Sequence, residues 1–176
     1  DLGGAPVEID PTPAEVPWSV PLDEDEEHRR YDPTAVASYF AAATHAALVL
    51  HALRARHDAR ATFVNAWWGS FDVAVSLFSP LPSGELAEFA AGWWPGDTKY
   101  PVPAFYAYGQ PTPEGFSGPA LDVPRAEWHA ELGEYILDWD DVAAAADPAA
   151  AALDFIVSAF RVIADANGAS APPLGT

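Results

Sequence analysis

The chain has 176 residues, half of them apolar and 12% aromatic, which suits one domain with a sizeable core. Its 26 acidic residues against 8 Lys and Arg give a net charge of −18, so we expect neither nucleic acid nor an anionic membrane surface as a partner. Cysteine is absent, which excludes thiolate metal sites, and no apolar run approaches ~18 residues, so we expect a soluble, cytoplasmic protein.

Five prolines punctuate residues 1–22, which excludes a helix and disfavours a central strand. We therefore expect an extended Pro-rich arm that lies on another surface. Its apolar anchors would be Val7, Ile9, Val16, Trp18 and Val20.

An acidic run from Asp23 to Glu27 follows the arm and stands directly before His28. Such a run is most often a solvated loop. A carboxylate beside a histidine can also raise the pKa of the imidazole and tune it for proton transfer. Glu27 and His28 are therefore candidate acid–base residues.

Two long helices are predicted from one start signal, an Asp at the N-cap followed by a Pro at the first helical position. The first runs from Pro33 to about His57, and the second from Pro148 to Asn167. Helical spacing predicts a buried face on each. These faces are Val36, Phe40, Ala43, Ala47 and Leu50 on the first helix, and Leu153, Ile156, Val157, Phe160 and Ile163 on the second.

The segments between the helices have strand character. Residues 62–79 predict one strand with a bend at Gly69, and residues 103–108 a short aromatic strand. Residues 85–94 fit either a helix or a short strand, and residues 128–138 a strand or a hairpin around Gly133.

Strands placed between two helices, without βαβ alternation, indicate an α+β fold. We predict an antiparallel sheet of three to five strands packed by two long helices. The arm of residues 1–22 would precede a single domain over residues 23–168, and residues 169–176 would form a mobile tail.

A candidate site lies at Trp67-Trp68-Gly69-Ser70-Phe71-Asp72, directly before an alternating strand. Burying a carboxylate in an apolar strand costs free energy unless the carboxylate is paired or has a functional role. Asp72 therefore either accepts backbone hydrogen bonds in a bulge or anchors a ligand. In the second case Asp72 and Tyr106 would be catalytic or anchoring groups. Trp67, Trp68 and Trp94 would then wall the pocket, although aromatic stripes are more often core packing.

Metal binding is weakly indicated. His45, His51 and His57 are six residues apart on the first helix, so they spread ~120° apart around its axis and cannot form one site. Glu127, His129 and Glu131 alternate and could face one way, but the solvated face of an edge strand is the more common reading. We expect no metal and no cofactor.

Several motifs, taken in order, resemble a bacterial family of unknown function, domain-of-unknown-function family 5996. They are Pro21-Leu22-Asp23-Glu24-Asp25-Glu26-Glu27-His28, Trp68-Gly69-Ser70-Phe71-Asp72, Trp94-Pro95-Gly96, Pro103-Ala104-Phe105-Tyr106-Ala107-Tyr108 and Glu131-Leu132-Gly133-Glu134-Tyr135. The resemblance implies no activity, and it suggests longer members with a strand-rich N-terminal half that this chain lacks.

Two functions follow as hypotheses. In the first, the chain binds a small molecule in an aromatic pocket anchored by Asp72, with general acid–base catalysis as one use of that site. In the second, it is a non-catalytic interaction module that packs on a missing N-terminal half, a partner chain or a second copy. The second hypothesis predicts a contiguous exposed apolar surface.

Overall fold

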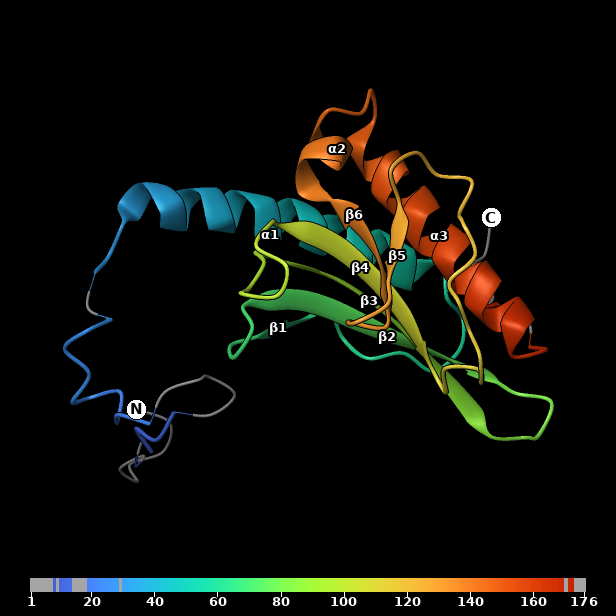
Figure 1. Ribbon diagram of the computed structural model, residues 1–176, viewed down its shortest axis with the longest axis horizontal. Helices are drawn as coiled ribbons and strands as arrows, with labels where there is room; N and C mark the ends of the chain where they lie inside the picture. The colour runs from blue at the N-terminus through green and yellow to red at the C-terminus, as the bar shows by residue number, and fades with distance from the viewer. Residues whose placement is uncertain (1–7, 9, 14–18, 29, 170, 173–176) are drawn as a thin grey trace.

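The computed structural model describes residues 8, 10–13, 19–28, 30–169 and 171–172. Over these residues the chain forms one six-stranded antiparallel sheet and three helices (Figure 1). The predicted α+β class and the two long helices are confirmed. The strand count exceeds the predicted three to five because two edge strands have only three residues each, too few to show an alternating pattern.

The elements follow one another along the chain as α1 (Pro33–Ala55), β1 (Asn65–Trp67), β2 (Asp72–Pro80), β3 (Leu86–Trp94), β4 (Ala104–Gln110), β5 (Glu127–His129), β6 (Glu134–Asp138), α2 (Trp139–Ala143) and α3 (Pro148–Ala166). The strand order in the sheet is β1-β2-β3-β4-β6-β5, and every neighbouring pair is antiparallel. Most connections are therefore hairpins, with β5 folding back onto the outer edge of β6.

Both long helices begin where the capping signal predicts. Asp32 accepts hydrogen bonds from the backbone N–H groups of Thr34 and Ala35, and Asp147 accepts one from Ala150. These carboxylates satisfy N–H groups that have no partner inside the helix.

The buried face of α3 matches the prediction at Leu153, Ile156, Phe160 and Ile163. The predicted face of α1 is wrong at Phe40, which is 62% exposed. Buried residues on α1 begin at Ala43, and Phe40 lies on the exposed side of the helix together with Leu48, which is also 62% exposed.

Helix α1 is also long and apolar, although the sequence has no unbroken apolar run that approaches ~18 residues. Among the described residues it is the one helix with the length and mean hydropathy to cross a bilayer. A search of the sequence for an unbroken apolar run does not find α1, because Thr, Ser and His interrupt its Ala-rich sequence. The core helices of soluble proteins have the same property, so this alone does not place the chain in a membrane.

The stretch of residues 62–79 is not one bent strand. It divides into β1 and β2, which pair antiparallel with Trp67 opposite Asp72. The turn between them contains Gly69 and ends at Phe71, whose φ of 57° lies in the left-handed region. Residues 85–94 are a strand, and residues 128–138 form the hairpin around Gly133.

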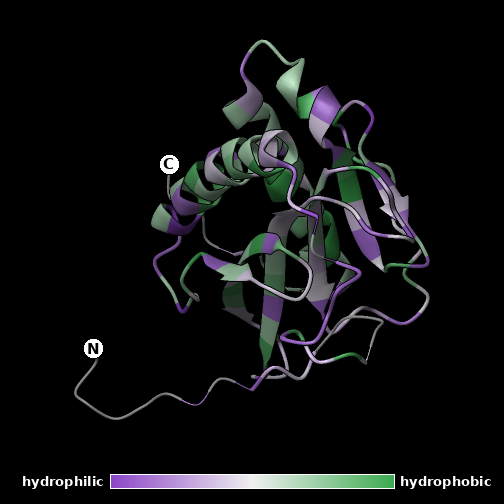
Figure 2. Cartoon of the chain, turned by 90° about the vertical axis from the view of Figure 1, so that its left-hand side faces the viewer, coloured by the Kyte–Doolittle hydropathy of each residue, from purple (hydrophilic) through white to green (hydrophobic). Residues whose placement is uncertain are grey.

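The two faces of the sheet differ in what covers them. The inner face, with Val75, Leu77, Phe89 and Phe105, packs against α1 and α3 in the main core. The outer face has a small separate cluster, formed by Trp94, Ala104, Tyr106 and Ile136. Figure 2 shows hydrophobic and hydrophilic segments on the same strands, as expected when side chains alternate between two unlike faces.

The ends of the chain are only partly described. Of the predicted arm anchors, Val7, Ile9, Val16 and Trp18 lie outside the described residues, and Val20 is exposed. In the predicted tail, residues 170 and 173–176 lie outside them, and Ala171 packs against the core.

Candidate functional site

A sharp turn places Asp72 at the first position of β2, facing the outer side of the sheet. The side chain is buried, with 8% of its surface exposed. The preceding Phe71 adopts a positive φ that is unusual for a bulky residue. Tyr39 on α1 donates a hydrogen bond of 2.9 Å from its hydroxyl to the Phe71 carbonyl oxygen. This contact ties the turn to the long helix.

Both carboxylate oxygens of Asp72 accept side-chain hydrogen bonds. The Ser70 hydroxyl donates to Oδ1, and the Tyr106 hydroxyl donates to Oδ2 at 2.5 Å. The carboxylate is therefore paired with two hydroxyl groups, which lower the cost of burying it.

Tyr106 reaches Asp72 by crossing the strand that separates them. Tyr106 on β4 pairs with Gly92 on β3, and Asp72 lies on β2 beyond it. A Cβ atom at Gly92 would lie 2.4 Å from the Tyr106 hydroxyl and 2.4 Å from its Cζ atom. Glycine is thus required here so that the ring can lie flat over the backbone.

An open pocket of about 250 Å³ adjoins this pair on the outer face. Four strands and three connecting turns or loops contribute to it. It is lined by Ser70, Asp72, Trp94, Asp97, Tyr106, Tyr108, Leu132 and Glu134. We call it the outer-face pocket.

The outer-face pocket has an acidic interior. Burial, followed by the charges of Asp72 and Asp97, raises the pKa of Glu134 to about 7. Burial and the Asp72 charge also raise the pKa of Tyr106, so its hydroxyl stays protonated and remains a donor. Within the described residues, the pocket lining contains no Lys, Arg or His to balance these carboxylates.

Aromatic rings form the walls of the pocket. Trp94 and Tyr106 meet edge to face with centroids 5.4 Å apart, and Tyr106 stacks on Tyr108 at 6.2 Å. Tyr100 also packs on Trp94 and donates a hydrogen bond of 2.6 Å to Asp138. The site therefore combines aromatic surface, hydroxyl groups and carboxylates.

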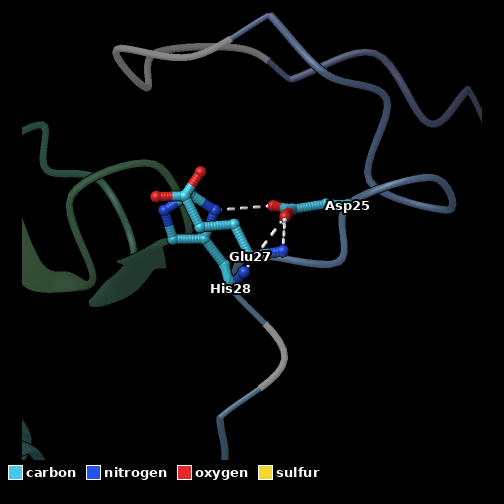
Figure 3. A network of polar contacts seen from close by, with 3 residues as sticks. All are labelled: Asp25, Glu27 and His28. Atoms are coloured by element: carbon cyan, nitrogen blue, oxygen red, sulfur yellow. Dashed lines mark hydrogen bonds and ion pairs between the residues drawn. The ribbon is translucent and has the colours of Figure 1, made fainter.

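The structure brings together three of the residues proposed from sequence, namely Asp72, Tyr106 and Trp94. It does not bring Glu27 and His28 to them. Figure 3 shows these two residues beside Asp25, which accepts from both of their backbone N–H groups and lies 2.7 Å from His28 Nδ1.

Trp67 and Trp68 are more than half exposed at the β1 edge and do not line the outer-face pocket. Within the described residues, no group of three or more His, Asp or Glu side chains could hold a metal ion. Glu127 and His129 lie on β5, whereas Glu131 lies in the following turn. The strand therefore ends two residues before Glu131, so the three side chains do not alternate along one strand.

Sequence reasoning missed Glu134, Tyr108 and Asp97 as parts of the pocket. A signal for the first two existed, since Glu134 begins a strand and Tyr108 lies two residues after Tyr106 on the same face. What the sequence lacked was the strand order that places β6 beside β4. Asp97 comes from a loop and had no such signal.

The site and the fold together define an α+β protein with an acidic, aromatic pocket on the sheet face opposite its long helices. A family of unknown function, DUF5996, matches residues 2–172. The chain belongs to this family, as the motif resemblance suggested. Comparison with curated proteins and with solved structures finds no match.

Proposed function

We propose that this chain binds a small organic molecule in the outer-face pocket, with Asp72 as the polar anchor and a protonated amine as the recognised group. The observation that carries the proposal is the buried Asp72–Tyr106 pair at the base of a pocket whose charged lining residues are all acidic. A bound cation would relieve the repulsion among these carboxylates.

The aromatic walls favour the same ligand class. A cation over the face of Trp or Tyr is stabilised by about 0.5–2 kcal/mol, depending on its desolvation. Trp94, Tyr106 and Tyr108 provide such faces around the three carboxylates. An anionic ligand would instead face uncompensated negative charge.

Glu134 gives the pocket a group for proton exchange. Its pKa of about 7 lies where a general acid or base works best near neutral pH. In an enzymatic use of the site, Glu134 would exchange a proton with the ligand while Asp72 and Tyr106 hold it. This role replaces the one considered for His28 and Glu27.

The proposal is tested by calorimetric titration with benzylamine, benzyl alcohol and benzoate, which share a ring and differ in charge. Binding of the amine alone, weakened at least tenfold by Asp72→Asn, is the expected result. The matched control is Asp122→Asn, at an exposed carboxylate that does not line the pocket. Equal binding of the three compounds, or no effect of Asp72→Asn, would refute the proposal.

A non-catalytic interaction module is the second candidate function. The observation that favours it is the exposure of Trp67, Trp68 and Phe71 around the β1–β2 turn. Exposed aromatic residues of this kind are typical of interaction sites. Trp68→Ser would weaken partner binding and leave amine binding unchanged, whereas Asp72→Asn would do the reverse.

A further inference from the structure

One edge of the sheet is formed by β1 and by the residues that lead into it from α1. β1 is the first strand in the sheet order, so among the described residues no strand pairs with its other side (Figure 1). All three of its residues are exposed. An unpaired edge presents backbone N–H and C=O groups to which another strand can be added. We call residues 60–67 the free edge.

The segment from Pro33 to Phe71, which comprises α1 and the free edge, differs in charge from the rest of the chain. It contains three arginines and one acidic residue, Asp58, which gives a net charge of +2 with histidine counted as neutral. The other residues therefore carry −20, since the whole chain carries −18. A basic region on so acidic a chain is the part that attracts a negatively charged partner.

The three arginines lie where α1 ends and the free edge begins. Within the described residues, Arg54, Arg56 and Arg60 form no salt bridge. Arg54 donates a hydrogen bond of 2.6 Å from Nε to the Thr62 carbonyl oxygen, which fixes this side chain against the edge. A guanidinium has several N–H donors, so Arg54 retains others for a carboxylate.

Aromatic rings hold two of the guanidinium groups on opposite sides of the free edge. Arg54 Cζ lies 5.5 Å from the ring centroid of Phe63, and Arg60 Cζ lies 5.0 Å from that of Phe78. Arg54 belongs to α1 on the inner side of the sheet, whereas Phe78 alternates with the inward-facing Leu77 and so points outward. Stacking on a ring restrains a guanidinium and leaves the N–H groups at its rim free to donate.

Apolar surface accompanies these charges. Phe63 and Trp67, both in the free edge, are 75% and 53% exposed. Of the carboxylates nearby, Glu88 accepts a hydrogen bond of 2.5 Å from the Ser76 hydroxyl, and Asp58 is exposed to solvent. A partner that fits this surface therefore carries apolar side chains next to its acidic ones.

We propose that the free edge binds an extended acidic segment of another protein, which adds a strand beside β1 and places carboxylates against Arg54 and Arg60. The unpaired strand selects an extended backbone, the arginines select acidic residues, and the exposed rings select apolar residues between them. This inference rests on the second candidate function, for which it assigns the chemistry of the partner, and it does not depend on the amine site.

Fluorescence anisotropy with short labelled peptides tests the preference for acidic residues. The peptides alternate Val with Glu, Gln or Lys, so they share an extended apolar face and differ in charge. We expect the Glu–Val peptide to bind about tenfold more tightly than the Gln–Val peptide, and its affinity to fall as salt is added. Equal binding of these two peptides would leave an interaction surface in place but overturn the acidic partner.

Arg60→Gln should weaken binding of the Glu–Val peptide about tenfold, because it removes a charge-assisted hydrogen bond. Arg161→Gln, at an exposed arginine on α3, is the matched control and should bind as wild type does. Asp72→Asn should also leave peptide binding unchanged. An equal effect of Arg60→Gln and Arg161→Gln would overturn the proposal, since net charge alone would then explain the binding.

Peptide N-methylation tests the addition of a strand. One Glu–Val peptide is methylated at the backbone nitrogens of its Glu residues and another at those of its Val residues. Alternate N–H groups of a strand point to opposite edges, so we expect one peptide to lose binding and the other to retain it. Retained binding by both, no binding of the unmethylated peptide to wild type, or association of the chain with itself through this edge would overturn the proposal.

Discussion

The Tyr106 hydroxyl donates a 2.5 Å hydrogen bond to Asp72 Oδ2 across the intervening strand β3. Three strands must therefore keep their register for this one contact to exist. The contact also links the stability of the outer face to the geometry of the proposed ligand site, so substitutions that break it should affect both.

Tyr106→Phe removes the donor and leaves the buried Asp72 carboxylate with Ser70 as its remaining hydroxyl partner. We expect a loss of about 1–3 kcal/mol in the free energy of unfolding, the range for an under-satisfied buried polar group. Urea unfolding measures it. Tyr108→Phe is the control, because the Tyr108 hydroxyl donates no hydrogen bond within the described residues. An equal loss of stability in Tyr108→Phe would show that the broken contact with Asp72 is not the cause.

Gly92→Ala tests whether the absence of a side chain at Gly92 allows the Tyr106 ring to lie over β3 and reach Asp72. The new methyl group would overlap the Tyr106 ring, so we expect a destabilisation of about 1–3 kcal/mol and a loss of amine binding. The same substitution in a Tyr106→Ala background should cost much less. A cost that is unchanged in that background would show that the ring and the glycine do not interact.

The raised pKa of Glu134 predicts a specific dependence of the free energy of unfolding on pH. A carboxyl group whose pKa is raised from 4.5 to about 7 on folding holds its proton more tightly in the folded state. This group therefore makes the protein less stable as pH rises from about 4.5 to about 7, by about 3 kcal/mol in all. The loss is complete above pH 7 and absent below 4.5.

Glu134→Gln removes this titration. The variant should be more stable than wild type at pH 8, and the difference should vanish toward pH 4.5. Thermal unfolding across this range measures the effect, with Glu131→Gln, an exposed residue of the same hairpin, as the control. A difference that is constant with pH would contradict the assigned pKa.

Tyr39→Phe tests the tie between α1 and the turn before Asp72. The variant loses the hydrogen bond to the Phe71 carbonyl oxygen but keeps the ring that packs on Trp93. We expect a loss of about 1 kcal/mol in stability and weaker amine binding, because Phe71 is held at a positive φ. Tyr31→Phe, at an exposed tyrosine, should change neither quantity.

The parts of the fold that the sequence predicted are those with local physical signals. Asp32 and Asp147 mark both long helices through capping, and the residues around Gly133 indicated a strand or a hairpin, of which the hairpin forms. The face of α1 was mispredicted at Phe40, because this helix carries large apolar residues such as Phe40 and Leu48 on its exposed side as well as on its buried side.

The site was predictable only in part. A carboxylate entering an apolar strand singled out Asp72 without any knowledge of its neighbours. Its pairing with Tyr106 and the place of Glu134 depend on the strand order, which no local pattern carries. Adjacency to Glu27 in the sequence was misleading for His28, because the His28 ring lies 2.7 Å from the Asp25 carboxylate.

The claim that Asp72 anchors a cation is tested most directly by a crystal structure of the protein with benzylamine bound. The account predicts the ammonium group within hydrogen-bond distance of the Asp72 or Glu134 carboxylate, with the ring against Trp94 or Tyr108. Benzylamine bound elsewhere on the molecule, or an outer-face pocket left empty at a saturating concentration, would contradict it.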